Sequence, residues 1–322
     1  MNSPILTSLR LPIVAAPMFL VSGPDLVVSA CQSGVIGSFP TQNCRTLDDL
    51  DSWMGSITDR LGSGANGSTN PAPWAANLVT HSSNQRLADD LRLIAEYKPK
   101  LVITALGSPK PVMDVVKGYG GIVIADVVNM TLAHKAADAG VDGMACVSAG
   151  AGGHTGHLSP FAFTSAVREF FDGMIIIGGG ISDGFGVAGA ITAGADLVYM
   201  GTRFLAAEES MAQQAYKQMI VDSGPDDLVV SASVTGTPAS WLKPSLIAAG
   251  LDPDNLAPLT VEKNYTAGGG SLKRWKDVWA AGQGLQTIHA VEPVSKIVDQ
   301  IAAEYGTALQ RISDGHPVSA GV

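Results

Sequence analysis

The sequence predicts an α/β protein built as a (β/α)₈ barrel, with a smaller helical subdomain inserted after the eighth strand. Three observations indicate this fold. Short apolar runs recur eight times in the first two thirds of the 322 residues, helix-length segments separate most of them, and the rhythm stops between residues 206 and 285. A row of eight strand–helix units favours a closed barrel over an open sheet.

The predicted strands are continuous apolar runs that end in small residues. Unbroken apolar runs are typical of parallel strands that are buried on both faces. A composition with 46% apolar and 15% charged residues suits the large core that such strands need. The runs are IVAAPM (13–18), VIGSFP (35–40), WAANLVT (74–80), LVITALG (101–107), GIVIADVV (121–128), GMACVSAG (143–150), MIIIGGG (174–180) and LVYMGT (197–202).

Helix-length segments lie between most of these runs. PDLVVSACQSG (24–34), TLAHKAADAG (131–140) and GFGVAGAITAG (184–194) each end in glycine, the residue most common just past a helix C-terminus. The connection 41–73 departs from the pattern. It contains the Gly- and Ser-rich stretch GSGANGSTNPAP (62–73), which predicts a flexible surface loop.

Two domains are expected. Residues 1–205 and 286–322 form the barrel, which the helical stretch VEPVSKIVDQIAAEYGTAL (291–309) closes. Residues 206–285 contain the helix-like ESMAQQAYKQMIVDSG (209–224) and Pro- and Gly-rich pieces. We expect this part to form a helical subdomain that covers the substrate site over the barrel mouth.

Composition limits the partners and the location. A net charge of −9 without a basic cluster argues against nucleic acid. No apolar run reaches the roughly 20 residues needed to span a membrane, and the N-terminal stretch lacks the features of a signal peptide. A cytoplasmic location is therefore expected. Cys31, Cys44 and Cys146 are scattered without a C-x-x-C, which predicts reduced, buried thiols and neither a disulfide framework nor a metal site.

The loops after the seventh and eighth predicted strands carry the clearest binding signal. Many barrels bind a phosphate at these two loops. GGGISDG (178–184) and MGT (200–202) supply glycines whose backbone N–H groups can reach phosphate oxygens, and Thr202 adds a hydroxyl. Two ordinary tight turns are the alternative interpretation.

A dinucleotide fingerprint is a rival interpretation. G-x-G-x-x-G occurs as GSGANG (62–67) and GFGVAG (184–189). The first follows no predicted strand. The second lies several residues past one, and no acid follows the next strand to hold a ribose, so a dinucleotide fold is disfavoured.

The stretch AGAGGHTGHLSP (149–160) follows the sixth predicted strand, which places His154 at the barrel mouth. A histidine with a pKa of about 6.5 is suited to take a proton at neutral pH. The surrounding glycines let the chain press against a cofactor. His157 could form a metal pair with His154, but no third ligand is evident. A histidine that only bonds to backbone is the remaining alternative.

Two polar residues interrupt the apolar strands. An amide at a strand end, such as that of Asn77, can hydrogen-bond a ring that presents donors and acceptors, or it can satisfy local backbone groups. Asp126 could be a second acid or base, or it could cap the next helix. Cys146 is expected in the core.

Six motifs, in this order, resemble those of the nitronate monooxygenase family, formerly called 2-nitropropane dioxygenases. The similarity covers residues 10–290. Each motif alone is common, whereas the set is specific. The motifs are APM (16–18), ANL (76–78), AGAGGHTG (149–156), GGGISDG (178–184), YMGT (199–202) and WAAGQG (279–284).

The resemblance implies an FMN-dependent TIM barrel with an added helical domain. His154 matches the histidine proposed to take the α-proton of a nitroalkane. Met18 and its neighbours would lie against the flavin, Asn77 would bond to it, and Gly152 and Gly153 would pass beside it. Its phosphate would be held by Gly180, Met200, Gly201 and Thr202. The cofactor-binding residues so implied are Pro17, Met18, Asn77, Gly152, Gly153, Gly179, Gly180, Tyr199, Met200, Gly201 and Thr202.

The implied reaction oxidises a nitronate with O₂ to a carbonyl compound and nitrite, with the flavin carrying the difficult step. Related barrels are NAD(P)H:quinone reductases and enoyl-thioester reductases. Fold and cofactor therefore do not decide the substrate, and NAD(P)H with a quinone stays an alternative to a nitronate. A catalytically silent flavin-binding protein is a third class. The monooxygenase is favoured because no adenine-nucleotide pocket is obvious. The role of His157, which lies outside the family motif, stays open, and a homodimer is expected.

Overall fold

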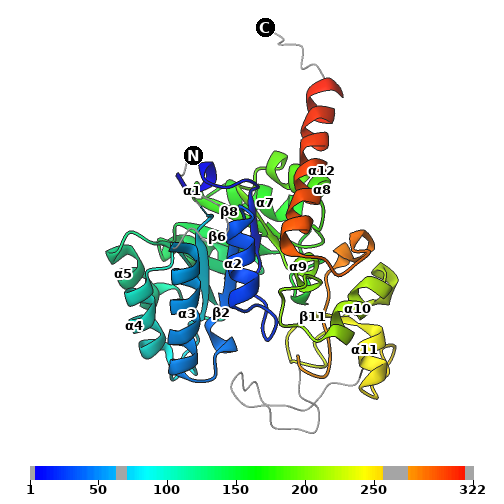
Figure 1. Cartoon of the computed structure of the whole chain (residues 1–322), viewed down its shortest axis with the longest axis horizontal. Helices are drawn as coiled ribbons and strands as arrows, with labels where there is room; N and C mark the ends of the chain where they lie inside the picture. Colours follow the sequence, from blue (N-terminus) through cyan, green and yellow to red (C-terminus); the bar gives the residue numbers. More distant parts are fainter. Residues whose placement is uncertain (1–3, 63–70, 257–274, 316–322) are drawn as a thin grey trace.

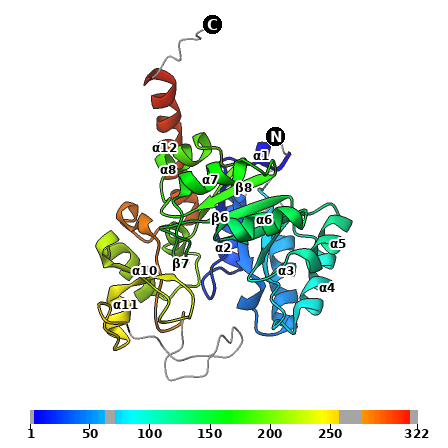
Figure 2. The same ribbon diagram turned by 180° about the vertical axis from the view of Figure 1, so that it is seen from behind.

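The computed structural model describes residues 4–62, 71–256 and 275–315, and within them eight parallel strands close into a barrel (Figures 1 and 2). The strands follow the chain order, and pairing of the last with the first closes the barrel. Each lies inside a predicted apolar run, so the predicted (β/α)₈ class is confirmed. They are β1 (Ile13–Ala15), β2 (Ile36–Pro40), β3 (Trp74–Val79), β4 (Leu101–Ala105), β5 (Ile122–Val127), β6 (Gly143–Val147), β8 (Met174–Gly178) and β9 (Leu197–Met200).

Alternate residues of each strand enter two different cores. Val14, Ile103 and Ile124 pack inside the barrel. Their chain neighbours Val102 and Val123 pack between the barrel and the surrounding helices. Both faces are dry because side chains on a strand alternate in direction, which is why the runs are continuously apolar.

Helices surround the barrel, and several begin at a side chain that caps them. Asn129, Ser159 and Asp183 each accept a backbone N–H three residues on. Among the described residues, no helix is both long and apolar enough to cross a membrane. The helices are α1 (Pro4–Thr7), α2 (Pro24–Gln32), α3 (Leu47–Gly62), α4 (Leu87–Tyr97), α5 (Lys110–Gly118), α6 (Met130–Asp138), α7 (Pro160–Arg168), α8 (Gly184–Thr192), α9 (Thr202–Leu205) and α12 (Val294–Gly315).

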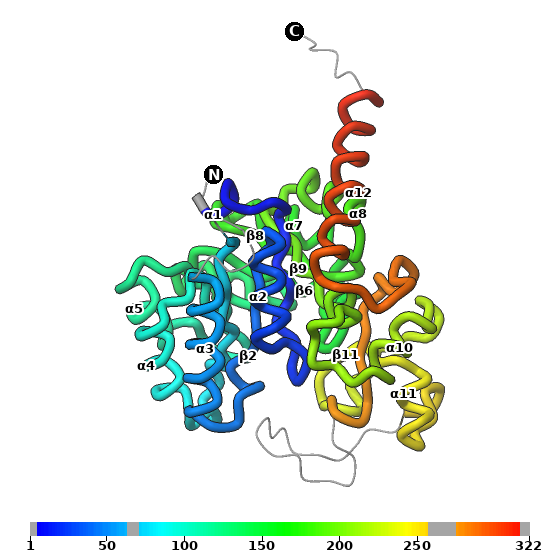
Figure 3. The backbone as a smooth tube through the Cα atoms, in the orientation of Figure 1, coloured from blue at the N-terminus to red at the C-terminus, as the bar shows by residue number. Residues whose placement is uncertain are grey.

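The closing helix α12 packs along α8 and α2, and its C-terminal half extends away from the rest of the chain (Figure 3). The contact with α8 is close at Gly184, where an added Cβ would overlap backbone atoms of Ile301 and Tyr305. Glycine at this position therefore serves helix packing.

The prediction of a flexible loop across 41–73 was wrong for much of that segment. Thr41–Asn43 forms the 3₁₀ turn η1, and Leu47–Gly62 forms α3. The helix buries Leu50, Met54 and Ile57, a spacing that puts all three on one face. The glycines that suggested a loop lie at its end, and residues 63–70 lie outside the described residues.

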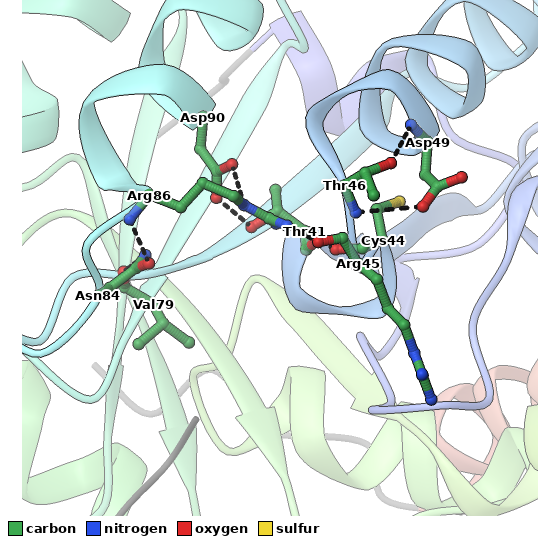
Figure 4. A network of polar contacts seen from close by, with 9 residues as sticks. All are labelled: Thr41, Cys44, Arg45, Thr46, Asp49, Val79, Asn84, Arg86 and Asp90. Carbon is green, nitrogen blue, oxygen red and sulfur yellow. Dashed lines mark hydrogen bonds and ion pairs between the residues drawn. The ribbon is translucent and has the colours of Figure 1, made fainter. Parts of the chain in front are cut away.

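The turn after β2 is fastened to α4 by Arg86 (Figure 4). Its guanidinium donates to the carbonyl oxygens of Thr41 at 2.9 Å and Cys44 at 2.7 Å, and to Asp90 Oδ1 at 2.8 Å. The Thr41 hydroxyl also donates to Asp90, at 3.1 Å. Burial raises the pKa of Asp90, and the neighbouring guanidinium opposes that shift. This ion pair holds one side of the barrel mouth in place.

The cysteines Cys31, Cys44 and Cys146 are buried as free thiols. Burial raises the pKa of each to about 12. They are therefore thiols, and poor nucleophiles, at neutral pH.

The segment 206–285 contains the expected helices and also two strands that the sequence analysis did not predict. Its elements are α10 (Gln214–Asp222), η2 (Pro225–Asp227), β10 (Leu228–Ser231), β11 (Ala239–Leu242), α11 (Lys243–Ala248) and the start of η3 (Gln283–Thr287). In the described part of the chain, β10, β11 and β7 (Gly153–His154) form a small antiparallel sheet in that order. The loop after β6 is thereby joined to the insert.

Candidate active site

Four segments meet at one point of the barrel mouth: the loops after β6, β8 and β9, and the start of η3 with the preceding Gly282. The carbonyl oxygen of Gly150 accepts the N–H of Gly180 at 3.0 Å and that of Gln283 at 2.9 Å. The N–H of Gly282 donates to Thr202 Oγ1 at 2.9 Å. We call these residues, together with Gly152, Gly179 and Gly201, the glycine cradle. It joins motifs that lie up to 133 residues apart in the sequence.

Side chains would close the cradle. A Cβ on Gly152 would lie 2.6 Å from the N atom of Gly282, and one on Gly282 would lie 2.8 Å from the O atom of Gly150. Gly179 and Gly180 have φ angles of +147° and +67°, which other residues rarely adopt. A Cβ on Gly180 would make ordinary van der Waals contact with Gln283, 3.6 Å from its Cβ, so the φ angle more than crowding favours glycine at this position.

The loop after β1 lies against the cradle. The N–H of Ala16 donates to the carbonyl of Met200 at 3.0 Å, which joins the ends of β1 and β9. Met18 Sδ lies 3.6 Å from the position of a Cβ on Gly201. Pro17 and Met18 are both half-buried there.

Asn43, which sequence reasoning missed, holds that loop. Its amide donates to the carbonyls of Met18 at 3.1 Å and Ser22 at 2.8 Å and accepts the N–H of Leu20 at 2.8 Å. Leu20 needs this support because its φ is +62°.

Two of the predicted residues point away from the cradle. The Met200 side chain is fully buried in the layer between barrel and helices. The Tyr199 side chain lies inside the barrel. Any contact of Met200 with a ligand at the mouth would therefore use its backbone.

A polar cluster occupies the inner wall of the barrel. Asn77 on β3 donates to the carbonyl of Ile103 at 3.3 Å and to Asp126 Oδ2 at 3.5 Å. Asp126 Oδ1 and the Tyr199 hydroxyl are both buried, and neither has a hydrogen-bond partner of normal geometry. Asp126 does not cap α6, because Asn129 does.

Burial dominates the electrostatics of this cluster. It raises the pKa of Asp126 to about 7, and the nearby Tyr199 hydroxyl partly offsets that shift. Burial and the neighbouring carboxylate raise the pKa of Tyr199 well above its usual value. The carboxyl therefore holds its proton for a substantial fraction of the time at neutral pH.

His154 lies on β7, where it pairs with Ala239 of β11. Its ring meets the indole of Trp275 edge-on, with centroids 5.3 Å apart, and Trp275 in turn packs on the buried Trp241 at 4.7 Å. Burial lowers the pKa of His154, which favours the neutral imidazole. A neutral imidazole can accept a proton, as expected of a base.

Two residues near His154, namely Gly153 and His157, have different surroundings from it. Gly153 carries a φ of +67°, and a Cβ there would lie 3.6 Å from the Trp275 ring. His157 is exposed. In residues 4–62, 71–256 and 275–315, no three His, Cys, Asp or Glu side chains form a group that could hold a metal.

The family follows from the whole chain. Residues 4–304 match the family model described as nitronate monooxygenase. The chain belongs to the nitronate monooxygenase family. Members of this family are flavin-dependent oxidoreductases. The glycine cradle and His154 thus lie in an enzyme barrel, at the end where such barrels carry their chemistry.

Individual relatives divide between two activities. The chain is 26% identical over 301 residues to a nitronate monooxygenase of Paraburkholderia phytofirmans, covering 80% of each. It is 28% identical over 244 residues to a Rhodococcus jostii protein, covering 75% of this chain and 65% of the relative. That relative is named as a dehydrogenase of a hydroxy-methyl-oxo-octahydroindene-carboxyl-CoA.

A solved structure supports the fold. FabK from Thermotoga maritima superposes with a TM-score of 0.77 over 97% of this nitronate monooxygenase family member and 99% of FabK, at 22% identity. At that identity the likeness concerns the fold alone.

Proposed function

We propose that this protein is an FMN-dependent nitronate monooxygenase that converts alkyl nitronates and O₂ to a carbonyl compound and nitrite. The observation that carries the proposal is the position of His154. A half-buried imidazole with a lowered pKa lies on the loop that also builds the glycine cradle. A base and part of the glycine cradle on one loop suit a flavin enzyme that acts on an acidic carbon.

The residues of the cradle fit a flavin phosphate. Glycine at 150, 152 and 282 lets the segments of the cradle pack together, because a Cβ on any of them would lie 2.6 to 2.8 Å from an atom of another segment. We propose that a compact anion binds at the mouth beside Gly180, where a Cβ would meet no atom closer than 3.6 Å. Thr202 Oγ1 accepts one N–H and keeps its own proton to donate. We propose that Pro17, Met18, Asn77 and Gly153 line the flavin ring.

A single-phosphate flavin is supported by the fate of the other glycine motif. GFGVAG forms the start of α8, with Asp183 as its cap. Gly184 is needed for packing against α12, as the overlap with Tyr305 indicates. The glycines of this motif belong to the helix and serve its packing, so we assign no second nucleotide to them. This argues for FMN and against a flavin with a second nucleotide moiety.

A bound flavin would supply electron transfer between the organic substrate and O₂. The protein would supply the proton chemistry and the shelter. His154 would take the α-proton of a neutral nitroalkane, a step that a nitronate anion does not need. Trp275, which packs on Trp241, covers one side of the imidazole and helps to shield it from water.

We also propose that residues 206–285 form a subdomain over the substrate site. Pairing of β11 with β7 supports this, because it ties the insert to the residue that would meet substrate. The expected homodimer and cytoplasmic location stay predictions.

The experiment has two parts. Heat release and chromatography of the bound pigment should yield FMN. Ethyl nitronate in air should then give nitrite with O₂ consumption, whereas NADH or NADPH with a quinone, and a CoA thioester, should turn over far more slowly. Release of FAD, or faster turnover of NAD(P)H or the thioester, would contradict the proposal.

A further inference from the structure

The barrel interior contains one polar cluster among apolar side chains. Its lining includes Val14, Ile36, Ile103, Ile124, Ala145 and Ile176. Asn77 on β3, Asp126 on β5 and Tyr199 on β9 are the polar members. A carboxyl group in such surroundings is costly unless it is protonated or hydrogen-bonded.

No structural duty explains Asp126. It does not cap α6, and it belongs to none of the ion pairs formed by the described residues. Asp126 Oδ1 and the Tyr199 hydroxyl are buried without a normal hydrogen bond. The two groups interact with each other, but neither atom makes a hydrogen bond of normal geometry, which leaves Asp126 Oδ1 available to a bound group.

The position of the Asp126 carboxyl indicates which bound group it would contact. Asp126 is the last residue but one of β5, at the end of the barrel that forms the mouth, and the residue as a whole is only half-buried. Asn77, 3.5 Å from Asp126 Oδ2, is the amide proposed above to bond to the flavin ring. The flavin ring has one N–H donor and several acceptors, which are its carbonyl oxygens and its bare ring nitrogens. A protonated carboxyl can donate to these acceptors, whereas an ionised carboxylate would repel them and could bond only to the N–H.

We propose that the Asp126 carboxyl binds in its protonated form, donates a hydrogen bond to the flavin ring, and makes flavin binding depend on that proton. This inference rests on the proposed flavin site. Tyr199 is a positioning residue whose hydroxyl tunes the proton affinity of Asp126.

The direction of the pH dependence follows from linkage. Burial raises the pKa of Asp126 to about 7 before the ligand binds. A ligand that needs the protonated carboxyl binds fully below that pH, and its affinity falls by up to about tenfold per pH unit above it. The affinity stops falling once the pH exceeds the pKa of Asp126 in the complex, which is higher than its pKa in the free protein.

Other groups around Asp126 do not titrate in that range. Tyr199 from β9 and Cys146 from β6 interact electrostatically with Asp126, and burial keeps the pKa of each well above 9. The pKa of His154, on the neighbouring loop, is lowered from 6.5. Asp126 is therefore the group expected to titrate between pH 7 and 9.

The test measures the FMN dissociation constant from pH 6 to pH 9, by the fluorescence of FMN released when the holoprotein is diluted. In the wild type the constant should rise at least about tenfold between pH 7 and 9. In Asp126→Asn it should change less than about twofold, because the amide cannot ionise. Asp138→Asn, which removes an exposed carboxylate at the end of α6, should follow the wild type.

Tyr199→Phe gives a second, independent readout. The hydroxyl lowers the pKa of Asp126, so its removal should move the onset of the affinity loss to higher pH. This variant decides the matter if Asp126→Asn does not fold. A flat wild-type profile, a wild-type-like profile in Asp126→Asn, or an unmoved onset in Tyr199→Phe would overturn the inference while leaving the flavin function intact. A wild type that binds no flavin at any pH would overturn both.

Discussion

The ring of His154 stands perpendicular to that of Trp275, with an angle of 85° between their planes and 5.3 Å between their centroids. The two residues come from different parts of the chain, with 120 residues between them in the sequence. Because Trp275 helps to bury the imidazole, it contributes to the lowered pKa of His154. Several expectations about activity depend on this contact.

The first prediction concerns the choice of histidine. His154→Asn should reduce the turnover of neutral nitroalkanes by about 10²- to 10⁴-fold, the usual effect of removing a general base. Turnover of preformed ethyl nitronate should largely survive, because its proton is already gone. Initial rates of nitrite formation, measured with both substrates, give the comparison.

His157→Asn is the matched control, since His157 is exposed three residues away. Both variants must first be shown to hold equal amounts of flavin. If the His157 substitution reduced activity more than the His154 substitution, the choice of His154 as the base would be wrong. Equal loss of nitronate activity in both would mean that the loop is structural.

The second prediction uses pH. A base works when it is unprotonated, so kcat/KM for a nitroalkane should fall as the pH drops through the pKa of His154. Burial sets that pKa below 6.5. Trp275→Leu should expose the imidazole, raise its pKa and move the acidic limb to higher pH. An acidic limb that stays in place would show that Trp275 does not shield His154.

The third prediction tests the glycine cradle. Gly180→Val should cut flavin content sharply, because a φ of +67° disfavours a branched residue and its side chain would enter the proposed phosphate site. Thr202→Ala should weaken binding by only about 1 kcal/mol, the value of one hydrogen bond. Flavin absorbance per protein, measured after purification, reports both effects.

Gly194→Val controls for backbone strain. Gly194 also has a left-handed φ, of +105°. It follows the C-terminal end of α8, whereas the cradle residues of the β8 loop precede the N-terminal end of that helix. Both valine variants should lose thermal stability, and only Gly180→Val should lose flavin. Full flavin retention in Gly180→Val would refute the position of the phosphate.

The fourth prediction concerns stability. Arg86→Leu leaves the buried Asp90 carboxylate without its partner, so the free energy of unfolding should fall by about 3 kcal/mol. Arg92→Leu, on the same helix, breaks the exposed pair with Glu96 and should cost less than about 1 kcal/mol. Urea unfolding of both variants measures the difference, and equal losses would contradict the role given to Arg86.

Much of this barrel was predictable because its signals are local. Each strand is a continuous apolar run, and the cradle glycines other than Gly282 lie in loops that follow strands, where their position in the fold follows from their position in the chain. His154 was found in the same way. The glycine-rich end of the 41–73 segment hid α3, whose buried Leu50, Met54 and Ile57 carry the helical spacing.

The missed residues depend on contacts between distant parts of the chain. Trp275 touches His154 only because β11 brings the insert to β7, and four-residue strands such as β10 and β11 carry too little pattern to predict. Gln283 lies in a motif that was noticed, but its approach to Gly150 needed the fold. Asn43 lies in a 3₁₀ turn without any periodic signal.

The most direct test of the proposed function is anaerobic mixing of the flavin-loaded protein with ethyl nitronate and, separately, with NADH or NADPH, while the flavin absorbance is followed. If the protein is a nitronate monooxygenase, the nitronate should change the flavin spectrum rapidly, and the nicotinamides should bleach it slowly or not at all. Rapid two-electron bleaching by NADH or NADPH, reversed by a quinone, with no response to the nitronate, would contradict the account.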